Sequence, residues 1–523
     1  MKNILTIAAI ACASMATFSS CSDFLDEEPK SQLTGVAFYK TEAQAVANVN
    51  YLYRTGATSE INTRSGAYDN CRAARTGYLT GYFLNDYEGQ ELSDKYSREL
   101  KRQEFTMRVS NDMGGIWSGC YRAINVANGG IKHIPEIKMD ENLKNKLIAE
   151  AKFFRAFNYF TLVKYYGAVP LSVEPYETQD NMYLERTSVE QVYAVIEQDL
   201  KDAMAALPAT PFYQNDCRVG KYVAAMTLTA VYMQQGKYAE AAQTAKVVID
   251  SPHKLLENDD LKLGSAFNKL RTQDGSAESI YAFEYNETIS HSGGWTQQAF
   301  DAAATNLFNT YSIFNRGYGA SDQFLNIYEP NDLRIQPNQF FHWEYTHPLT
   351  GKTWKSDRAC NWFWYDEKAI VETGRGTKDR DIFRFAEALL DGAEAIAQSQ
   401  GVTSEAANYL AQVQARANME GKTVAQIAAE LQKLGQQQFI EACWTERLRE
   451  FPLEYRIWED VLRTGKFPVI SKTTKGQVQY VDVVGAKNGS GFTFTKSDLL
   501  WPLPISELQR NPKLTQNEGY QTE

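Results

Sequence analysis

Tryptophan is concentrated in one stretch of the chain, between residues 255 and 378. Five of the nine tryptophans lie there. The stretch is also rich in Gly, Asn, Asp and Ser and lacks helical periodicity. Indole and phenol rings offer flat apolar faces beside a polar edge, which suits stacking against a ligand. The aromatic residues concerned are Trp295, Trp343, Trp354, Trp362 and Trp364, together with Tyr318.

This stretch is predicted to be a ligand-binding segment. Loops carried on a rigid scaffold are where binding residues usually lie, and only short β-like runs such as 279–285 interrupt the loops here. We select Trp295, Tyr318, Trp343 and Trp362 as candidate ligand-binding residues. For any single tryptophan, packing in the core is the alternative and the commoner fate.

The histidines offer one possible metal-binding pattern, His342-x-Glu344-x2-His347. Its histidines are five residues apart, not the four that place two rings on one helix face, and Pro348 argues against a helix. The sequence also lacks G-x-S-x-G, H-E-x-x-H, G-x4-G-K-S/T and a twelve-residue calcium loop. We therefore predict no catalytic residues, no metal site and no cofactor, while calcium binding is a point that the sequence leaves open.

Carboxylate chemistry is harder to judge from sequence. Glycoside hydrolysis needs only two carboxylates at the right distance, so that possibility stays open at this point. In the helical regions, Glu150 lies five residues before Arg155, and Glu446 directly precedes Arg447. We expect Glu150–Arg155 and Glu446–Arg447 to be ion pairs near the core, not an acid and a base.

The chain opens with a leader that ends at a cysteine. Residues 4–16 are almost wholly small or apolar, and Ser19 and Ser20 directly precede Cys21. This layout is typical of a lipoprotein signal peptide and is too short for a membrane-spanning helix. We predict that residues 1–20 are removed, that Cys21 carries palmitate or similar acyl chains, and that acidic residues 21–40 form a tether. An ordinary cleaved signal with an incidental cysteine is the alternative.

Composition excludes some classes of function. The formal net charge is -10 at pH 7, and no dense Lys/Arg tract occurs, which argues against nucleic-acid binding. The cysteines beyond Cys21 are widely spaced, so neither a disulfide framework nor a zinc site is predicted. The fold must therefore be held together by its core.

Helical periodicity flanks the loop-rich stretch on both sides. Apolar spacing over 143–166 predicts a helix that ends at Gly167. A second helix is predicted over 188–207, where Ser188 and Gln191 could form a capping box. Both helices fall in the N-terminal half of the chain.

The segment 225–252 resembles a tetratricopeptide helix pair, in which small residues let two helices approach closely. Segments 381–398, 404–418 and 424–450 supply further helical pairs of similar length, so a solenoid of about four pairs is predicted. The residues at the expected spacings are Leu228, Tyr232, Gly236, Tyr238 and Ala241, with Pro252 near the closing position.

Together these patterns predict a mostly α fold. We expect a tetratricopeptide-like helical-pair scaffold with a large, irregular, loop-rich insertion that contains short β elements. Residues 41–254 would form the N-terminal helical scaffold and 255–378 the ligand-binding segment. Residues 379–523 would form the C-terminal scaffold and tail.

Six blocks of sequence, in order, resemble the SusD/RagB family of outer-membrane nutrient-binding lipoproteins. Each block alone is a moderate signal, but their order along the whole chain is specific. One departure is Tyr455 where the family usually has glycine, which puts the local turn and ion pairing in doubt. The matching blocks are 21–29, Trp117-x3-Tyr121-x2-Ile124-Asn125-x2-Asn128, 150–171, 385–390, Glu446-Arg447 with Glu450, and the tail from Leu500 to Asn517.

The resemblance implies capture of a ligand without catalysis. Members of this family bind a glycan at the cell surface, or a peptide in some branches, and deliver it to a SusC-like TonB-dependent transporter. It also implies a location on the extracellular face of the outer membrane, lipid-anchored at Cys21. From the loop that precedes Trp117 it adds Tyr68, Asp69, Asn70 and Arg72 as candidate ligand-binding residues.

Three functions are therefore considered. The first is a glycan-binding lipoprotein that works with a transporter, because sugar C–H faces pack on aromatic rings while hydroxyls need Asp, Asn and Arg partners. The second is a peptide-binding member of the same family. The third is a structural envelope protein that binds no soluble ligand.

Overall fold

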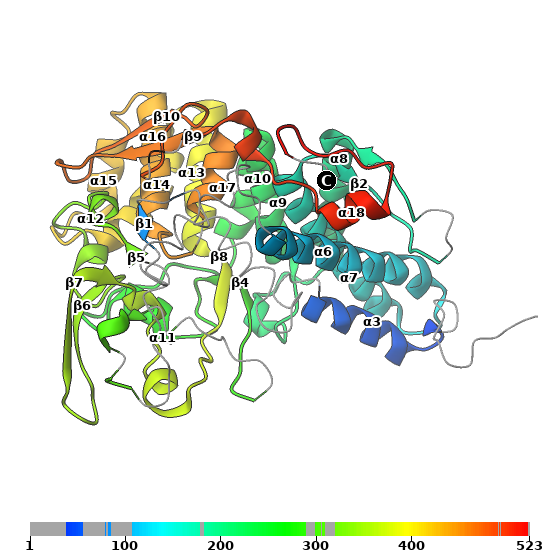
Figure 1. Ribbon diagram of the computed structural model, residues 1–523, viewed down its shortest axis with the longest axis horizontal. Coiled ribbons are helices and arrows are strands. Elements are labelled where there is room, and N and C mark those ends of the chain that lie inside the picture. The colour runs from blue at the N-terminus through cyan, green and yellow to red at the C-terminus, as the bar shows by residue number, and fades with distance from the viewer. Residues whose placement is uncertain are drawn as a thin grey trace, which may run out of the picture.

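The computed structural model describes residues 38–55, 79, 82–84, 107–177, 182–288, 296, 299–304, 306–308, 319–454, 456–489, 491 and 493–520. Over this part the predicted fold class is confirmed, because stacked helices carry an irregular insertion with short strands (Figure 1). The helices are α3 (Glu42–Thr55), α6 (Met107–His133), α7 (Glu141–Tyr166), α8 (Val189–Ala206), α9 (Lys221–Gln235), α10 (Tyr238–Ile249), α11 (Ala266–Thr272), α12 (Asp322–Leu325), α13 (Phe385–Gln400), α14 (Ser404–Ala417), α15 (Val424–Leu431), α16 (Gln436–Glu450), α17 (Ile457–Thr464) and α18 (Ile505–Arg510).

The strands of the described part pair only in twos, and every pair is antiparallel. The pairs are β1–β5, β2–β3, β4–β8, β6–β7 and β9–β10, so no extended sheet organises this part of the chain. Their bounds are β1 (Phe83–Leu84), β2 (Val169–Pro170), β3 (Arg186–Thr187), β4 (Ser279–Phe283), β5 (Gly319–Ala320), β6 (His342–Thr346), β7 (Thr353–Cys360), β8 (Arg380–Arg384), β9 (Lys466–Ile470) and β10 (Val478–Asp482).

Neighbouring helices pack side by side along the stack. α6 packs on α7, α7 on α8, α8 on α9 and α9 on α10. α10 then packs on α13, although residues 250–384 separate the two helices in sequence. These residues therefore leave the stack and return to it, and Figure 1 shows most of them below the helices.

Local sequence sets the ends of the N-terminal helices. The Asp140 side chain accepts a hydrogen bond from the Leu143 N–H (2.9 Å) and caps α7, and α7 ends at Gly167, whose φ of 72° favours glycine. The Ser188 hydroxyl accepts a hydrogen bond from the Gln191 N–H (3.3 Å) and caps α8. The helices predicted over 143–166 and 188–207 are thus confirmed to within two residues.

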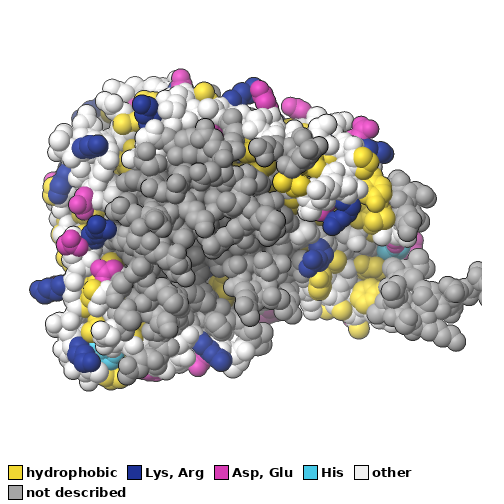
Figure 2. Space-filling model, viewed as in Figure 1, with side chains coloured by type: hydrophobic (Ala, Val, Ile, Leu, Met, Phe, Trp, Pro, Cys, Tyr) yellow, Lys and Arg dark blue, Asp and Glu magenta, His cyan; other side chains and the backbone are white. Residues whose placement is uncertain are grey.

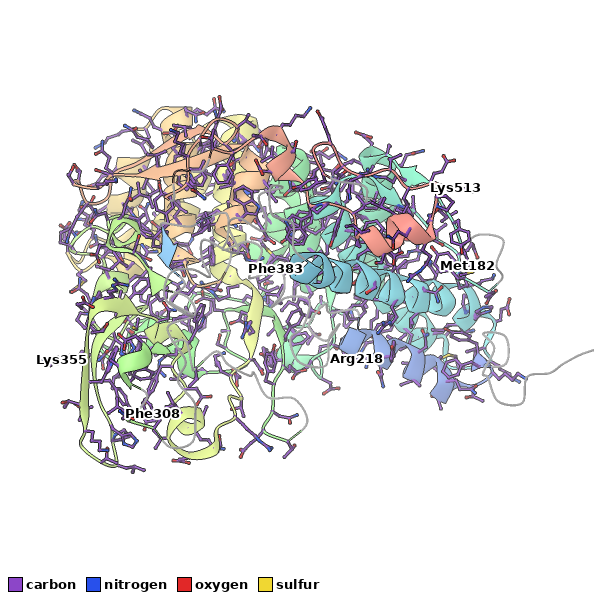
Figure 3. The ribbon with its side chains drawn as sticks, viewed as in Figure 1. Met182, Arg218, Phe308, Lys355, Phe383 and Lys513 are labelled. Atoms are coloured by element: carbon purple, nitrogen blue, oxygen red, sulfur yellow. The ribbon has the colours of Figure 1, made fainter. Side chains whose placement is uncertain are left out.

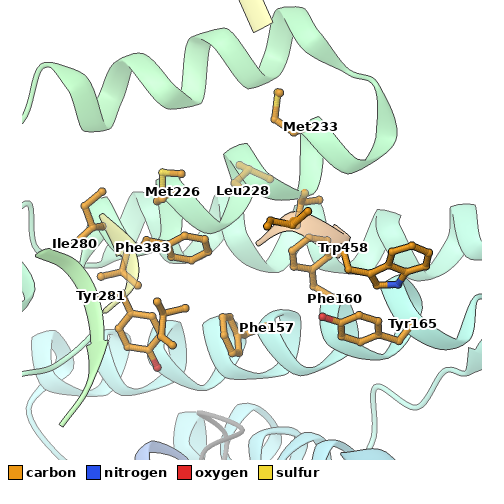
Figure 4. Packing of buried hydrophobic residues seen from close by; sticks show 14 of the residues in the cluster. Phe157, Phe160, Tyr165, Met226, Leu228, Met233, Ile280, Tyr281, Phe383 and Trp458 are labelled. Carbon is orange, nitrogen blue, oxygen red and sulfur yellow. The ribbon is translucent and has the colours of Figure 1, made fainter. Parts of the chain in front are cut away.

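The tetratricopeptide-like pair is formed by α9 and α10. Gly236 lies between them in the left-handed conformation (φ 69°), which turns the chain back on itself. The buried face of α9 meets α7, β4 and β8 in one continuous core (Figure 4). Residues of that core labelled in the figure are Phe157, Phe160, Tyr165, Met226, Leu228, Met233, Ile280, Tyr281, Phe383 and Trp458.

Two C-terminal elements differ from the sequence prediction. The helix expected from residue 381 begins only at Phe385, because residues 380–384 pair with β4 as strand β8. The segment 424–450 is divided into α15 and α16, and Gly435 caps the second helix. Residues 380–384 form a strand because they pair with the distant strand β4, and such pairing overrides local helix propensity.

The prediction that Glu150 pairs with Arg155 and that Glu446 pairs with Arg447 is wrong. Side chains on a helix face each other when they are three or four residues apart, not five or one. Each charge instead reaches another element. The partners are Arg218 for Glu150, Asp199 for Arg155, Arg334 for Glu446, and Asp391 among others for Arg447.

The C-terminal tail returns to the first helices. The Trp501 ring stacks on Tyr165 with centroids 4.2 Å apart. The backbone N–H of Trp501 donates a hydrogen bond to the backbone carbonyl of Tyr165 at 2.7 Å. The Asn517 amide donates to the carbonyls of Tyr166 and Trp501, which fixes the tail against the end of α7. Among the described helices, none combines the length and the apolar character that crossing a membrane requires.

Candidate functional site

A cavity of about 70 Å³ lies between the insertion and the helical stack. Its walls come from α11, from residues 363–366, from residues 378–381 at the start of β8, and from Leu453 and Glu454 after α16. Figure 3 labels Phe383, further along β8, near the centre of the molecule. A water molecule needs roughly 10–15 Å³ in such a measure, so the cavity holds a few waters or one small substituent of a ligand.

Aromatic side chains form one wall of the cavity. Phe363 and Trp364 are half-buried and line it, and Tyr365 is buried beside them. A short 3-10 turn over Trp362–Trp364 presents these rings. The Thr296 hydroxyl fixes the turn, because it donates to the Trp364 carbonyl (3.0 Å) and accepts from the Asp366 N–H (3.0 Å). This wall offers apolar ring surface for stacking.

Arg271, from the end of α11, lies against the aromatic wall. Its guanidinium lies over the rings of Trp362 and Tyr365, at 4.9 and 5.4 Å from their centroids. One N–H donates to the Tyr365 carbonyl at 2.7 Å. Burial lowers the pKa of Arg271 to about 10, so the side chain remains a cation at neutral pH.

Carboxylates also line the cavity. Asp379 accepts hydrogen bonds from the Tyr213 hydroxyl (2.7 Å) and the Tyr285 N–H (2.8 Å), and burial raises its pKa to about 6. Asp366 accepts from the N–H groups of Ala369 and Thr377. The cavity therefore combines ring faces with a cation and with acceptors, as recognition of a hydroxylated ligand requires.

Two of the predicted tryptophans fall in the described residues. Trp362 is only 7% exposed: its Nε1 donates to Asn268 Oδ1 (3.0 Å), and its ring stacks on Tyr365. This environment makes Trp362 a support for Tyr365 and Arg271 and disfavours direct contact with a ligand. Trp343, on β6, is half-buried against the main core and does not line the cavity, so it stays a candidate for a separate contact.

The other predicted binding residues, Tyr68, Asp69, Asn70, Arg72, Trp295 and Tyr318, lie outside the described residues, as does Cys21. Two described neighbours give their setting in the chain. Thr296, which follows Trp295, lines the cavity. β5, which follows Tyr318 in the sequence, pairs with β1.

Sequence reasoning missed Arg271, Phe363 and Asp379 as site residues. The available signal was the run Trp362-Phe363-Trp364-Tyr365-Asp366, in which rings and a carboxylate are consecutive. Choosing Trp362 from that run selected the ring that faces inward. The 3-10 turn, which no periodicity predicts, decides which ring faces the cavity.

Within the described residues, neither the surroundings of His342 nor the groove between α7 and α8 combines the features of a ligand or metal site. His342 is fully buried, with Nε2 2.5 Å from the Ala299 carbonyl oxygen, and burial lowers its pKa to about 4. Nowhere in the described ranges do three or more His, Cys, Asp or Glu side chains gather as metal ligands would. A wide groove of about 670 Å³ between α7 and α8 is lined by polar and small side chains, without an aromatic ring for stacking.

Comparison with known proteins identifies the family. The model described as "SusD family" matches residues 265–520, and the model described as "Starch-binding associating with outer membrane" matches residues 23–233. The chain belongs to the SusD/RagB family. The resemblance inferred from the six sequence blocks is confirmed.

Individual relatives agree over the full length. SusD-like protein P2 of Formosa agariphila is 27% identical over 527 residues, which cover 97% of this chain and 98% of that protein. The crystal structure of a SusD superfamily protein from Parabacteroides distasonis matches with a TM-score of 0.77 and 23% identity, over 91% of this chain and 99% of that one. Surface glycan-binding protein A of Bacteroides thetaiotaomicron, in complex with laminarihexaose, matches with a TM-score of 0.68 and 16% identity, over 92% and 100%. These structures support the fold.

Proposed function

We propose that this protein binds a glycan and does not catalyse its conversion. The observation that carries the proposal is the cavity wall, where Phe363 and Trp364 offer ring faces beside Arg271 and Asp379. Sugars need apolar surface for their C–H faces and charged or amide partners for their hydroxyls. The family descriptions and the laminarihexaose complex of a structural neighbour point in the same direction.

The cavity alone is too small for an oligosaccharide, because ligand pockets usually measure about 300–1,000 Å³. We propose that it receives one substituent or one edge of a sugar ring and that neighbouring surface holds the remainder. Trp343, and the predicted residues Tyr68, Asp69, Asn70, Arg72, Trp295 and Tyr318, are the proposed additional contacts.

We also propose that the protein acts at the cell surface, anchored to the outer membrane through a lipidated Cys21, and passes its ligand to a SusC-like TonB-dependent transporter. The leader and the family description support this location. Figure 2 shows acidic and basic side chains scattered over the described part of one face, without a broad basic patch. That distribution, with the net charge of -10, agrees with a ligand other than nucleic acid.

The test is calorimetric titration of the soluble chain from Ser22 onward against neutral and charged oligosaccharides and mixed peptides. Trp364→Ala should weaken glycan binding by about 10-fold, the loss expected when one aromatic contact of roughly 1–2 kcal/mol is removed. Tyr51→Ala is the control, because Tyr51 is 44% exposed on α3 and does not line the cavity.

Other outcomes would redirect the proposal. Binding of peptides alone would replace the glycan by a peptide ligand. A chain that binds nothing in the panel but forms a stable complex with a transporter would point to a structural role. Steady release of reducing ends from any glycan would contradict the proposal of binding without catalysis.

A further inference from the structure

Arg271 is unusual among the arginines of the interior. Each of the six buried arginines that the structure describes has a carboxylate partner within 4.0 Å: Arg155, Arg334, Arg384, Arg416, Arg447 and Arg456. Arg271 is half-buried and lines the cavity, yet no carboxylate of the described chain forms an ion pair with it. A desolvated charge without a counter-charge is costly, so interior charges are normally paired.

The groups in direct contact with Arg271 are neutral. They are the Tyr365 carbonyl, the faces of Trp362 and Tyr365, and Asn268 Oδ1 at 3.4 Å from both Nε and Nη2. The carboxylates of Asp366 and Glu367 lie near enough to favour its charged form without forming an ion pair with it. The Asn268 contacts are long, and Asn268 Oδ1 already accepts from Trp362 Nε1 at 3.0 Å. These contacts fix the plane of the guanidinium and leave N–H capacity for a partner in the cavity.

The carboxylates that share the cavity are engaged by other donors. Glu454 is bound by two nitrogens of Arg384, at 3.0 and 2.7 Å. Asp379 accepts from Tyr213 and Tyr285, and Asp366 accepts from backbone N–H groups, as described above. Asp381, the fourth carboxylate of the lining, accepts from the Ser279 hydroxyl. Two other cations line the cavity: Lys378 is paired with Asp274 at 2.7 Å, and Arg380 is also engaged by an interaction of its own. Arg271 is therefore the cation in this wall whose counter-charge a ligand could supply.

We propose that the cavity selects glycans that carry an anionic substituent, a carboxylate or a sulfate, and that Arg271 is the residue that binds this substituent. This inference rests on the proposed glycan-binding function and narrows its ligand class. The cavity volume of about 70 Å³ matches one such group better than a whole sugar ring. Arginine suits the role, because its planar fork binds carboxylate and sulfate-like groups through two parallel N–H donors.

The experiment compares three probes by calorimetry on the soluble chain: tetragalacturonate, a sulfated galactan tetrasaccharide and neutral laminarihexaose. The expected result is binding of at least one anionic probe that is at least 10-fold tighter than binding of laminarihexaose. Arg271→Gln should weaken that binding about 10- to 100-fold, which corresponds to loss of a charge-assisted hydrogen bond. The uronate and the sulfate arms distinguish the two sources of negative charge.

Controls separate recognition from folding. Arg271→Lys keeps the charge but loses the fork, so its loss should be intermediate. Arg375→Gln, an exposed arginine of the insertion that does not line the cavity, should bind as the unmodified chain does. Circular dichroism and thermal unfolding of each variant show whether Arg271→Gln still folds. If Arg271→Gln does not fold, the test uses the affinities of Arg271→Lys and the salt dependence of anionic binding by the unmodified chain. An ion pair between Arg271 and the ligand weakens as the salt concentration rises.

The results distinguish failure of the anionic-substituent inference from failure of the proposed glycan-binding function. Equal affinity for neutral and anionic probes, or anionic binding that Arg271→Gln leaves unchanged, would overturn the inference while glycan binding stands. Binding of laminarihexaose alone would do the same. Failure of all three glycans to bind would remove both this inference and the proposed function.

Discussion

Replacing Asp391 by asparagine should flatten the dependence of stability on pH near neutrality. Asp391 lies on α13, is 3% exposed, and is 2.5 Å from Nη1 of Arg447 on α16. Glu387 and Glu394 flank it on its own helix, at spacings of four and three residues that put all three carboxylates on one face. A cavity of about 90 Å³ adjoins this group.

Asp391 belongs to a network in which acids outnumber bases. Ion pairs and hydrogen bonds connect α7, α13, α16 and α17 through the same set of charges. Within the described part of the chain, five carboxylates of this network face four cations, so acids exceed bases by one when all are ionised. The carboxylates are Glu387, Asp391, Glu394, Glu459 and Asp460, and the cations are Lys164, Arg447, Arg456 and Arg463.

The excess is relieved when Asp391 takes a proton. Burial, together with Glu387 and Glu394, outweighs Arg447 and Arg463 and raises the pKa of Asp391 to about 7, against about 3.9 in an unfolded chain. The folded state therefore holds this proton more tightly, and the stability associated with it is lost as pH rises from about 4 to about 7. Between pH 5 and pH 8 the loss is about 2–3 kcal/mol, from 1.36 kcal/mol for each of about two pH units.

The assay is denaturant unfolding at pH 5, 6, 7 and 8 for the unmodified chain and for Asp391→Asn. The free energy of unfolding of the variant should gain about 2–3 kcal/mol relative to the unmodified chain across this range, because asparagine cannot ionise. Asp357→Asn, at an exposed position on β7, controls for charge removal alone. Parallel pH profiles for the Asp391 variant and the unmodified chain would refute the reasoning.

Three further changes test the packing of the scaffold by the same unfolding measurement. Gly392→Val should cost about 1–3 kcal/mol, because a Cβ at this position would lie 2.9 Å from Cδ1 of Ile249 and would separate α13 from α10. Gly236→Ala should cost about 1–2 kcal/mol, since its φ of 69° disfavours a side chain. Arg416→Met should cost about 3–5 kcal/mol by leaving Glu278 with one fewer buried cation. Losses below about 0.5 kcal/mol at any of these positions would contradict the packing or pairing described for it.

The helical scaffold could be predicted because its signals are local. Apolar spacing located α7, α8 and the α9–α10 pair, while Gly167 and Gly236 marked the ends of α7 and α9 and Pro208 the end of α8. The sequence prediction missed β8 because its residues also fit a helical pattern. They form a strand because they pair with β4, which lies about a hundred residues earlier in the chain. A lone sequence contains no information on which distant segment supplies such a partner.

The candidate site was predictable only as a region. The density of aromatic residues located it in the insertion, but exposure of each ring depends on contacts between separate segments. Trp362 is buried because Asn268 binds its Nε1 and Tyr365 stacks on its ring. Arg271 carried no sequence signal at all, since its importance lies in the absence, among the described residues, of a carboxylate within ion-pair distance.

Two parts of the cavity lining, β8 and the turn after α16, come from different parts of the chain, and a buried charge network holds them together. Arg384, at the end of β8, binds Glu454 on the cavity wall and also Glu278 before β4 and Glu450 on α16. Because breaking such a buried pair costs several kcal/mol, β8 and the turn after α16 cannot separate easily. The groups that face a ligand are therefore placed before it arrives, and preorganised sites lose less affinity to ordering on binding. The network thus fixes β8 and Glu454, on the carboxylate-bearing part of the cavity lining, to the helical stack.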